Sequence, residues 1–240
     1  MTASAHYSIH HQLFDLPHLT PGKRRRHIKG VLLLVHKGSG LLQLGRQHVP
    51  LTRGEGAFLP ADTLFAWHAL AGSRVSRIEL SCRLTQPQQA GRFYPTELLA
   101  AITGKLARWQ GEQTWQGPYG RLCRALHDEL PAQQLLPFEA MAELPARVAA
   151  NPAGFTLADN EQEDFRALFG CDAGNWQRQY ALLQMLRELP KAADPDALAK
   201  AHGFASFPQF EQDCWHWLGS PCHSRGKTAR IPLLHNFGFL

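Results

Sequence analysis

The sequence predicts an α+β fold in which an N-terminal β-barrel is followed by helices only. Up to about residue 85 the apolar residues come in short runs separated by glycine-containing turns, and residues 74–84 alternate apolar and polar side chains. This pattern is typical of the short strands of a barrel. After Pro87 the apolar residues recur at helical spacing. A chain of 240 residues that is 44% hydrophobic is long enough for one or two domains with apolar cores.

Six short segments are expected to form the strands of the barrel. They are residues 31–36, 41–44, 48–51, 57–60, 64–70 and 74–84. The connection Lys37–Gly40 has the composition of a hairpin turn, so the strands on either side of it are expected to pair. With the first strand expected at Val31, His6, His10 and His11 are expected in a mobile arm rather than in a metal site. A small barrel of this kind has room for one small ligand.

The second part of the chain is expected to be helical. The first helix follows Thr96 as its N-cap, and further helices are predicted over 119–130, 138–150, 162–169, 175–189, 195–202 and 208–218. The chain thus divides into a barrel over 1–90, a helical hairpin over 91–135, a helical domain over 136–225 and a tail over 226–240. The hairpin is a candidate for pairing subunits. The tail is expected either to pack on the chain or on a partner, or to be disordered.

Two of these helices, near the C-terminus, are joined by a tight turn. The helix over 195–202 ends at Gly203, the four residues Phe204–Phe207 follow, and the next helix ends at Gly219. Two short helices around such a turn form a helix-turn-helix. Its second helix enters the major groove in many DNA-binding proteins, so the pattern indicates gene regulation.

The distribution of charge complicates this interpretation. The formal net charge is +5, which favours an anionic partner. Residues 1–90 carry 11 Lys and Arg against 4 Asp and Glu, a net +7, whereas residues 136–240 carry 9 against 12, a net −3. The basic surplus therefore lies outside the predicted helix-turn-helix.

The cysteines and the hydropathy of the chain indicate in which cellular compartment the protein is expected. The five cysteines are scattered, which fits a reducing compartment better than a disulfide framework. No apolar run reaches the roughly 18 residues of a membrane-spanning helix, and the N-terminus has no signal-peptide pattern. A cytoplasmic protein is expected.

Several segments resemble the arabinose-regulator (AraC/XylS) family of bacterial transcription factors. They are Phe165–Gly170 (FRALFG), Asn175–Leu183, Ala197–Ser206 (ALAKAHGFAS) and Trp217–Pro221 in the helices, and Gly38–Gly40 and Gly54–Pro60 (GEGAFLP) in the barrel. The resemblance extends from about Lys23 to Arg225. It implies a cupin-like barrel, a helical hairpin and a C-terminal domain with two helix-turn-helix units.

The resemblance also implies a function, namely a dimeric, cytoplasmic regulator that binds DNA and responds to a small-molecule effector. The candidate DNA contacts are Ser206, Gln209, Gln212, His216, Lys200 and Arg225. The candidate ligand contacts in the barrel are Arg25, His27, Phe65, Trp67 and His68.

A metal-dependent cupin enzyme is a less favoured alternative. Such a site needs two or three histidines and a carboxylate. His27 stands where the family often has one of these histidines, but Arg25 and Phe65 fall at or near the other two positions. No metal, cofactor or catalytic residue is therefore expected, and the protein is not expected to be an enzyme.

The chain departs from the family in its first helix-turn-helix unit. Between Leu157 and Phe165 about one turn and helix is missing, and the remaining residues, 159–164, are mostly acidic. The helix over 208–218 carries no Lys or Arg. Because phosphate contacts supply much of the affinity for DNA, an alternative stays open. In that alternative the chain has lost DNA binding and acts through protein contacts or ligand binding.

The most basic segment is Lys23–Arg26. Three interpretations stay open for it: a solvated loop, a site for an anionic ligand or phosphate at the barrel mouth, or a docking site for the acidic domain of the same or another chain. Arginine suits the second because its guanidinium pairs with carboxylate and phosphate in a bidentate way.

Overall fold

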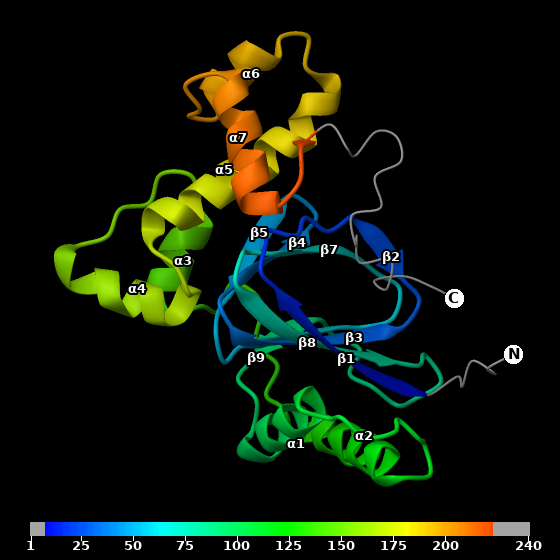
Figure 1. Cartoon of the computed structure of the whole chain (residues 1–240). Coiled ribbons are helices and arrows are strands. Elements are labelled where there is room, and N and C mark those ends of the chain that lie inside the picture. Colours follow the sequence, from blue (N-terminus) through cyan, green and yellow to red (C-terminus); the bar gives the residue numbers. More distant parts are fainter. Residues whose placement is uncertain (1–7, 223–240) are drawn as a thin grey trace, which may run out of the picture.

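The computed structural model describes residues 8–222, and within them the chain has the predicted α+β architecture (Figure 1). The strands are β1 (Ile9–Leu16), β2 (Arg25–His27), β3 (Gly30–Lys37), β4 (Gly40–Leu44), β5 (Gln47–Leu51), β6 (Gly56–Leu59), β7 (Thr63–Ala69), β8 (Ser73–Leu80) and β9 (Gly91–Phe93). They form two antiparallel sheets with the orders β1-β8-β3-β6-β9 and β2-β7-β4-β5. The sheets face each other and enclose the interior of the barrel (Figure 1).

Strand β3 shows why its sequence is an unbroken apolar run. Leu33 and Val35 pack between the two sheets, whereas Leu32 and Leu34 point to the opposite side and pack under helices. Successive side chains of a strand alternate between its faces, so a strand buried on both faces needs apolar residues at every position. The five-stranded sheet is therefore covered on both of its faces.

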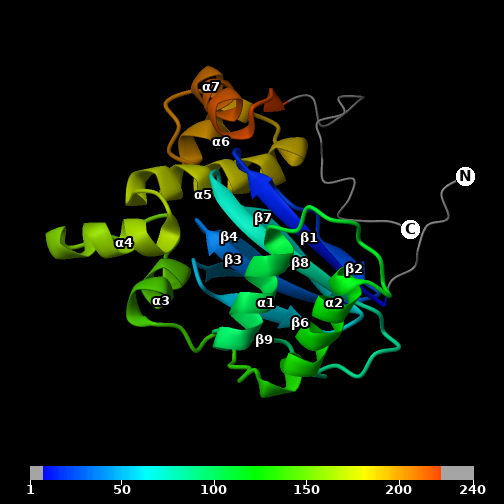
Figure 2. The same ribbon diagram turned by 60° about the horizontal axis from the view of Figure 1, so that its bottom comes forward.

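The helices follow the barrel in the chain. They are α1 (Glu97–Ala107), α2 (Pro118–Glu129), α3 (Glu143–Ala150), α4 (Gln162–Phe169), α5 (Ala173–Glu188), α6 (Pro195–Ala201) and α7 (Phe207–Leu218). Helices α1 and α2 lie side by side across the outer face of the five-stranded sheet (Figure 2). Leu99, Tyr119 and Leu126 from these helices share one buried cluster with Ile78 and Leu80 of β8.

Helices α3–α7 form one helical domain that packs against the four-stranded sheet and its β5 edge, with α6 farthest from the barrel (Figure 1). Leu19, Leu41 and Leu70 from the barrel segment are buried in the same cluster as the helical core around Trp176 and Phe210. The barrel and the helices α3–α7 therefore share apolar core, so their relative position is fixed by packing rather than by a linker alone.

Hydrogen bonds and a close backbone contact fix this docking at the C-terminal end of α4. The hydroxyl of Ser39 donates to the carbonyl of Phe169 at 2.9 Å, and the Arg53 amide donates to the carbonyl of Leu168 at 3.1 Å. Gly170 ends α4 with a φ of +79°, and a Cβ built there would come within 2.6 Å of the Gly38 Cα. Only glycine suits both the left-handed conformation and the close approach.

All six predicted strands are confirmed, but their expected pairing is partly wrong. The predicted hairpin at Lys37–Gly40 does not form, because β3 pairs with β6 and β8 whereas β4 pairs with β5 and β7. The segment instead carries the chain from one sheet to the other, with Gly38 at a φ of +70°. Strand β8 ends at Leu80 rather than at residue 84, because the Leu84 amide donates to the carbonyl of Ser81 in a turn.

Three strands were not expected. The predicted mobile arm is wrong for His10 and His11, since both lie in β1, which pairs with β8 along its whole length; His6 lies outside the described residues. Strand β2 takes in Arg25 and Arg26, so this part of the basic segment is not a solvated loop. Strand β9 extends the barrel sheet past the expected boundary at residue 90.

The predicted helices form with small shifts at their ends, apart from the one expected over 138–150. Helix α3 begins only at Glu143. Pro145 explains the late start, because proline is tolerated in the first turn of a helix but disrupts its interior. The expected tail over 226–240 lies outside the described residues.

A buried ion pair joins the turn before β6 to strand β9. The Glu55 carboxylate accepts hydrogen bonds from the amide and hydroxyl of Thr52 at 2.9 and 3.0 Å, and from the Tyr94 hydroxyl at 2.9 Å. The guanidinium of Arg92 also donates to this carboxylate, and both side chains of the ion pair are at most 3% exposed. Burying two charges is tolerated here because hydrogen bonds satisfy the carboxylate.

We expect Glu55→Ala to lower the free energy of unfolding by about 3–5 kcal/mol, because it leaves the Arg92 charge buried without its carboxylate. Arg26→Ala removes an exposed ion pair with Asp62 and serves as the control, with an expected loss below about 1 kcal/mol. Urea unfolding of both variants checks this. Equal losses in the two variants would contradict the role given to the buried pair.

Candidate functional site

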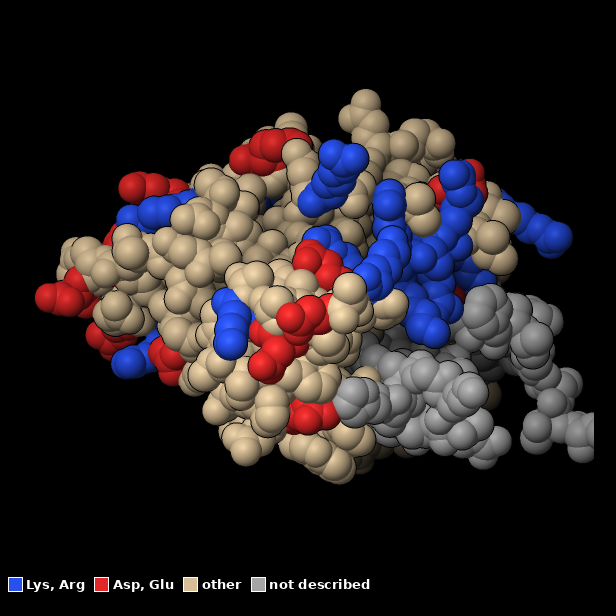
Figure 3. Space-filling model, turned by 90° about the horizontal axis from the view of Figure 1, so that it is seen from above, with Lys and Arg blue, Asp and Glu red and all other residues tan. Residues whose placement is uncertain are grey.

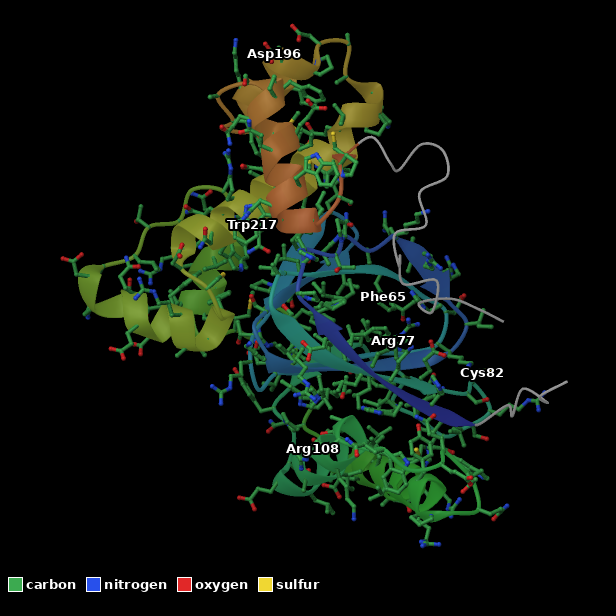
Figure 4. The ribbon with its side chains drawn as sticks, in the orientation of Figure 1. Phe65, Arg77, Cys82, Arg108, Asp196 and Trp217 are labelled. Carbon is green, nitrogen blue, oxygen red and sulfur yellow. The ribbon has the colours of Figure 1, made fainter. Side chains whose placement is uncertain are left out.

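The interior of the barrel contains a group of charged and aromatic side chains near strand β2. We call Arg25, His27, Phe65, Arg77 and Glu79 the interior polar cluster. In the register of β2 and β7, Arg25 lies opposite Phe65, which is buried between the sheets. Arg77 lies opposite Leu33, which also points into the interior. Figure 4 shows Phe65 and Arg77 between the two sheets.

Arg77 is the most buried cation of the cluster. Its side chain is 3% exposed and pairs with Glu79 at 2.6 Å, and one of its guanidinium nitrogens lies 3.4 Å from His27 Nδ1. Lys29 also pairs with Glu79, at 3.1 Å. Burial lowers the pKa of the Arg77 guanidinium. Burial alone would raise the pKa of the Glu79 carboxyl, but Arg77 and Lys29 outweigh it and hold that pKa below its ordinary value.

His27 is held neutral by this environment. Its ring stacks on Phe65 with the centroids 4.2 Å apart. Burial, followed by the charges of Arg77 and Arg25, lowers its pKa from 6.5 to about 4. Among residues 8–222, the interior polar cluster and its neighbour Lys29 bring three cations and one carboxylate close together. Positive charge of this kind favours binding of an anion.

The wall beside the cluster is apolar with one polar group. Trp67 is 4% exposed and packs between the sheets with Leu42 and Phe65. Its indole N–H is buried and has no hydrogen-bond partner among residues 8–222. A buried donor without a partner is costly, so this N–H is available to a polar group of a ligand or to water.

His68 does not belong to the barrel interior, which corrects the expectation that it lines a pocket with Trp67. Consecutive residues of a strand point to opposite faces, and His68 points outward. There it accepts a hydrogen bond from the Gly22 amide at 3.2 Å and lies near His48, whose ring meets Tyr180 of α5 edge-on. His68 is therefore part of the region where the barrel meets the helices.

A second candidate site is the helix-turn-helix formed by α6 and α7. Ser206 caps α7, and its hydroxyl accepts a hydrogen bond from the Gln209 amide. The Gln209 side chain donates to Asp213 at 3.0 Å. Gln212 and His216 are exposed one turn apart. Of the predicted DNA contacts on α7, these two therefore remain available for a partner, whereas Ser206 and Gln209 are engaged within the protein.

Arg178 of α5 holds this unit together. Its guanidinium forms an ion pair with Asp213 of α7, donates to the carbonyl of Gly203 in the turn at 3.0 Å, and lies 3.9 Å from the ring centroid of Phe204. One side chain thus joins the long helix, the turn and the second helix. The Phe207 amide also donates to Asp196 at 2.7 Å, which ties the start of α7 to α6.

The other basic candidates have different outcomes. Lys200 is exposed at the end of α6. Arg225 lies outside the described residues.

Figure 4 shows Asp196 at the end of the helical domain that is far from the barrel and Trp217 at the end near it. Helix α7 therefore runs toward the barrel, and its N-terminal end lies away from it.

The first helix-turn-helix unit differs from the second, as the sequence indicates. Residues 151–161 separate α3 from α4, so no tight turn joins them. Glu163 and Asp164 are exposed in the first turn of α4. The C-terminal end of α4 is bound to the barrel by Ser39 and Arg53. Arg166 is the exposed cation that α4 offers to a phosphate backbone, beside these two carboxylates.

Sequence reasoning missed Arg77, Glu79 and Arg178. A signal exists for the first two, because the alternation of residues 74–84 places them on the same strand face as the buried Val75. A charged residue on the inward face of a barrel strand is a candidate site residue. Nothing in the sequence around Arg178 indicates its three contacts, which join segments up to 35 residues apart.

Among residues 8–222, His, Cys, Asp and Glu side chains form no group of three or more that could hold a metal ion. No helix in the same range is both long enough and apolar enough to cross a membrane.

No family model matches the chain, and no curated protein matches it. Among solved structures it is similar to ToxT from Vibrio cholerae with an unsaturated fatty acid bound, at 9% identity over 91% of this chain and 94% of that chain, with a TM-score of 0.38. The chain is also similar to a cupin superfamily protein from Desulfitobacterium hafniense, at 16% identity over 34% of this chain and 74% of that chain, with a TM-score of 0.31.

We expect the His27 environment to make stability depend on pH. A folded-state pKa of about 4 lies below the ordinary 6.5, so the unfolded chain binds the proton more readily. Stability is full above about pH 6.5 and is lost as pH falls toward 4, by up to about 1.4 kcal/mol per pH unit from this residue. Urea unfolding between pH 7 and 4.5 should show a shallower pH dependence for His27→Gln than for the wild type. If the free energy of unfolding depends on pH equally in the two proteins, the lowered pKa of His27 is contradicted.

Proposed function

We propose that the protein is a transcription regulator that binds DNA through α6 and α7 and takes a small anionic effector into the barrel. The observation that carries the proposal is the pair Gln212 and His216, exposed one turn apart on a helix that Ser206 caps and Arg178 holds. In this proposal the protein is a cytoplasmic homodimer and not an enzyme. Its DNA partner is recognised in the major groove.

The chemistry of α7 suits base recognition better than phosphate binding. A glutamine side chain forms two hydrogen bonds with an adenine edge in the major groove, and Gln212 is exposed on α7. Lys200 is the candidate phosphate contact on α6. A homodimer strengthens such weak sites because two of them on one duplex bind with a raised effective concentration.

The interior polar cluster is the proposed effector site. Arg25 and Arg77 supply positive charge, while Phe65 and Trp67 supply apolar surface and an indole N–H. These groups suit a small molecule with an apolar body and one anionic group, such as an aromatic carboxylate. Control of DNA binding requires that the effector bind two states of the protein with different affinity.

A second function is favoured by the charge of the helical domain. Residues 136–240 have a net charge of −3, and the first turn of α4 exposes two carboxylates. Like charges repel a phosphate backbone. In this second candidate the chain has lost DNA binding and acts through the barrel ligand or a protein partner.

We expect Gln212→Ala to weaken binding to a duplex selected from a random library by roughly 5- to 150-fold, which corresponds to the loss of one bidentate base contact. Gln110→Ala, exposed in the hairpin region, is the matched control with no expected loss. Fluorescence anisotropy across a salt series checks both variants. If the wild type binds no duplex even at low salt, DNA recognition is excluded and the second candidate is favoured.

We expect benzoate, as a probe of the barrel, to shift the ring signals of His27 in nuclear magnetic resonance spectra. Arg25→Gln should weaken this binding by roughly 10- to 150-fold, because a charge-assisted contact is lost. Arg26→Gln is the control, since Arg26 lies next in the same strand but pairs outward with Asp62. Equal weakening in both variants would argue against a site in the interior.

A further inference from the structure

Helix α7 lacks the residues that hold a recognition helix on DNA. Its sequence, FPQFEQDCWHWL, contains no Lys or Arg. Affinity for DNA depends on the number of phosphates that cationic side chains neutralise, in addition to base contacts. If α7 binds DNA as proposed above, the cations must come from elsewhere in the molecule.

The barrel segment that precedes β2 touches the last turn of α7. The Leu19 amide donates to the carbonyl of Trp217 at 2.8 Å. A Cβ built on Gly219 would come within 2.9 Å of the His18 ring, so these two residues are in contact. The segment thus starts at the C-terminal end of α7 and continues toward β2 at the edge of the four-stranded sheet.

Basic residues follow this contact almost at once. Lys23 comes four residues after Leu19, and four extended residues span at most about 14 Å. Lys23, Arg24 and Arg26 are exposed, and we call these three residues the barrel basic run. Arg26 pairs with Asp62, whereas Lys23 and Arg24 pair with no carboxylate among residues 8–222. Arg25 points inward and belongs to the interior polar cluster.

The surface view agrees with this placement. Seen from above, Lys and Arg side chains gather on one side of the face, over the part of the barrel that holds β2 and next to the helical domain (Figure 3). Asp and Glu side chains lie over the helical domain itself (Figure 3). Besides Lys200 of α6, positive charge is therefore available beside the helix-turn-helix, although not on α7.

Exposed residues on one side of α7, which we call the α7 stripe, lie in a row that points toward the barrel basic run. Gln212, His216 and Gly219 follow one another at intervals of four and three residues, which places them on one side of the helix. Gly219 is the residue that contacts His18. At 1.5 Å per residue, Gln212 lies only about 10 Å along the axis from Gly219. A duplex that contacts this stripe has one phosphate backbone near the barrel.

We propose that the barrel itself completes the DNA interface, with Lys23 and Arg24 binding the phosphates that flank the groove occupied by α7. This inference rests on the proposed DNA binding of α7. It assigns to the barrel a second role besides effector binding, and it explains how an acidic helical domain can belong to a DNA-binding protein.

The test compares two double variants of the full chain by their affinity for a random-sequence duplex across a salt series. The first variant is Lys23→Ala with Arg24→Ala. The second, Lys105→Ala with Arg121→Ala, removes the same charge from exposed positions on α1 and α2, on the opposite side of the barrel (Figure 1). Both chains should keep the circular dichroism spectrum of the wild type.

We expect the first variant to bind more weakly by roughly 10- to 60-fold at about 0.1 M salt and to lower the slope of log affinity against log salt by about 2, since each phosphate contact contributes about 0.9. The second variant should keep the wild-type slope. Equal slopes in the wild type and the first variant would overturn the inference while leaving the proposed function standing. So would equal changes in both variants, which reflect net charge alone.

Two other results would also overturn it. If the first variant changes only the oligomeric state in sedimentation, the barrel basic run docks an acidic surface of a second copy of this chain rather than DNA. If the wild type binds no duplex at low salt, the inference falls together with the proposed function of α7.

Discussion

The packing of the helical domain against the four-stranded sheet is the constraint on which both candidate sites depend. Leu41 and Leu70 of the barrel segment are buried in the helical core, and Gly38 meets Gly170 with no room for a side chain between them. Burial of apolar surface is the main stabilising term in such a contact. The barrel and the helix-turn-helix therefore behave as parts of one packed body, and a change in one bears directly on the other.

Because side chains alternate along a strand, neighbouring residues of β2 and β7 point to opposite faces, one toward the barrel interior and one toward the outside. In β2, Arg25 faces the interior and Arg26 faces solvent, and in β7 Phe65 faces the interior while His68 faces the helices. Arg25, which is proposed to bind the effector, directly follows Lys23 and Arg24, which are proposed to bind phosphate and precede β2.

Charged side chains of this molecule occur both in buried ion pairs and as exposed cations, and the two kinds have different roles. The Arg92–Glu55 pair is buried, and Arg77 is buried beside the half-buried Glu79, whereas Lys23 and Arg24 are exposed. Buried pairs fix the structure because loss of one partner leaves an uncompensated charge. Exposed cations contribute little to stability and are available to an external anion. The net charge of the helical domain alone is thus a poor guide to what the whole surface binds.

The sequence by itself determined the order of barrel and helices, the six central strands and the two helices around Phe204–Phe207. It did so because apolar periodicity, glycine turns and caps such as Thr96 and Ser206 act over a few residues. It did not predict β1, the crossing of Lys37–Gly40 between sheets, or the contacts of Arg77 and Arg178. Only the tertiary structure decided these, because strand pairing and charge partners join residues far apart in the chain. A pattern that spans only a few residues does not predict such long-range contacts.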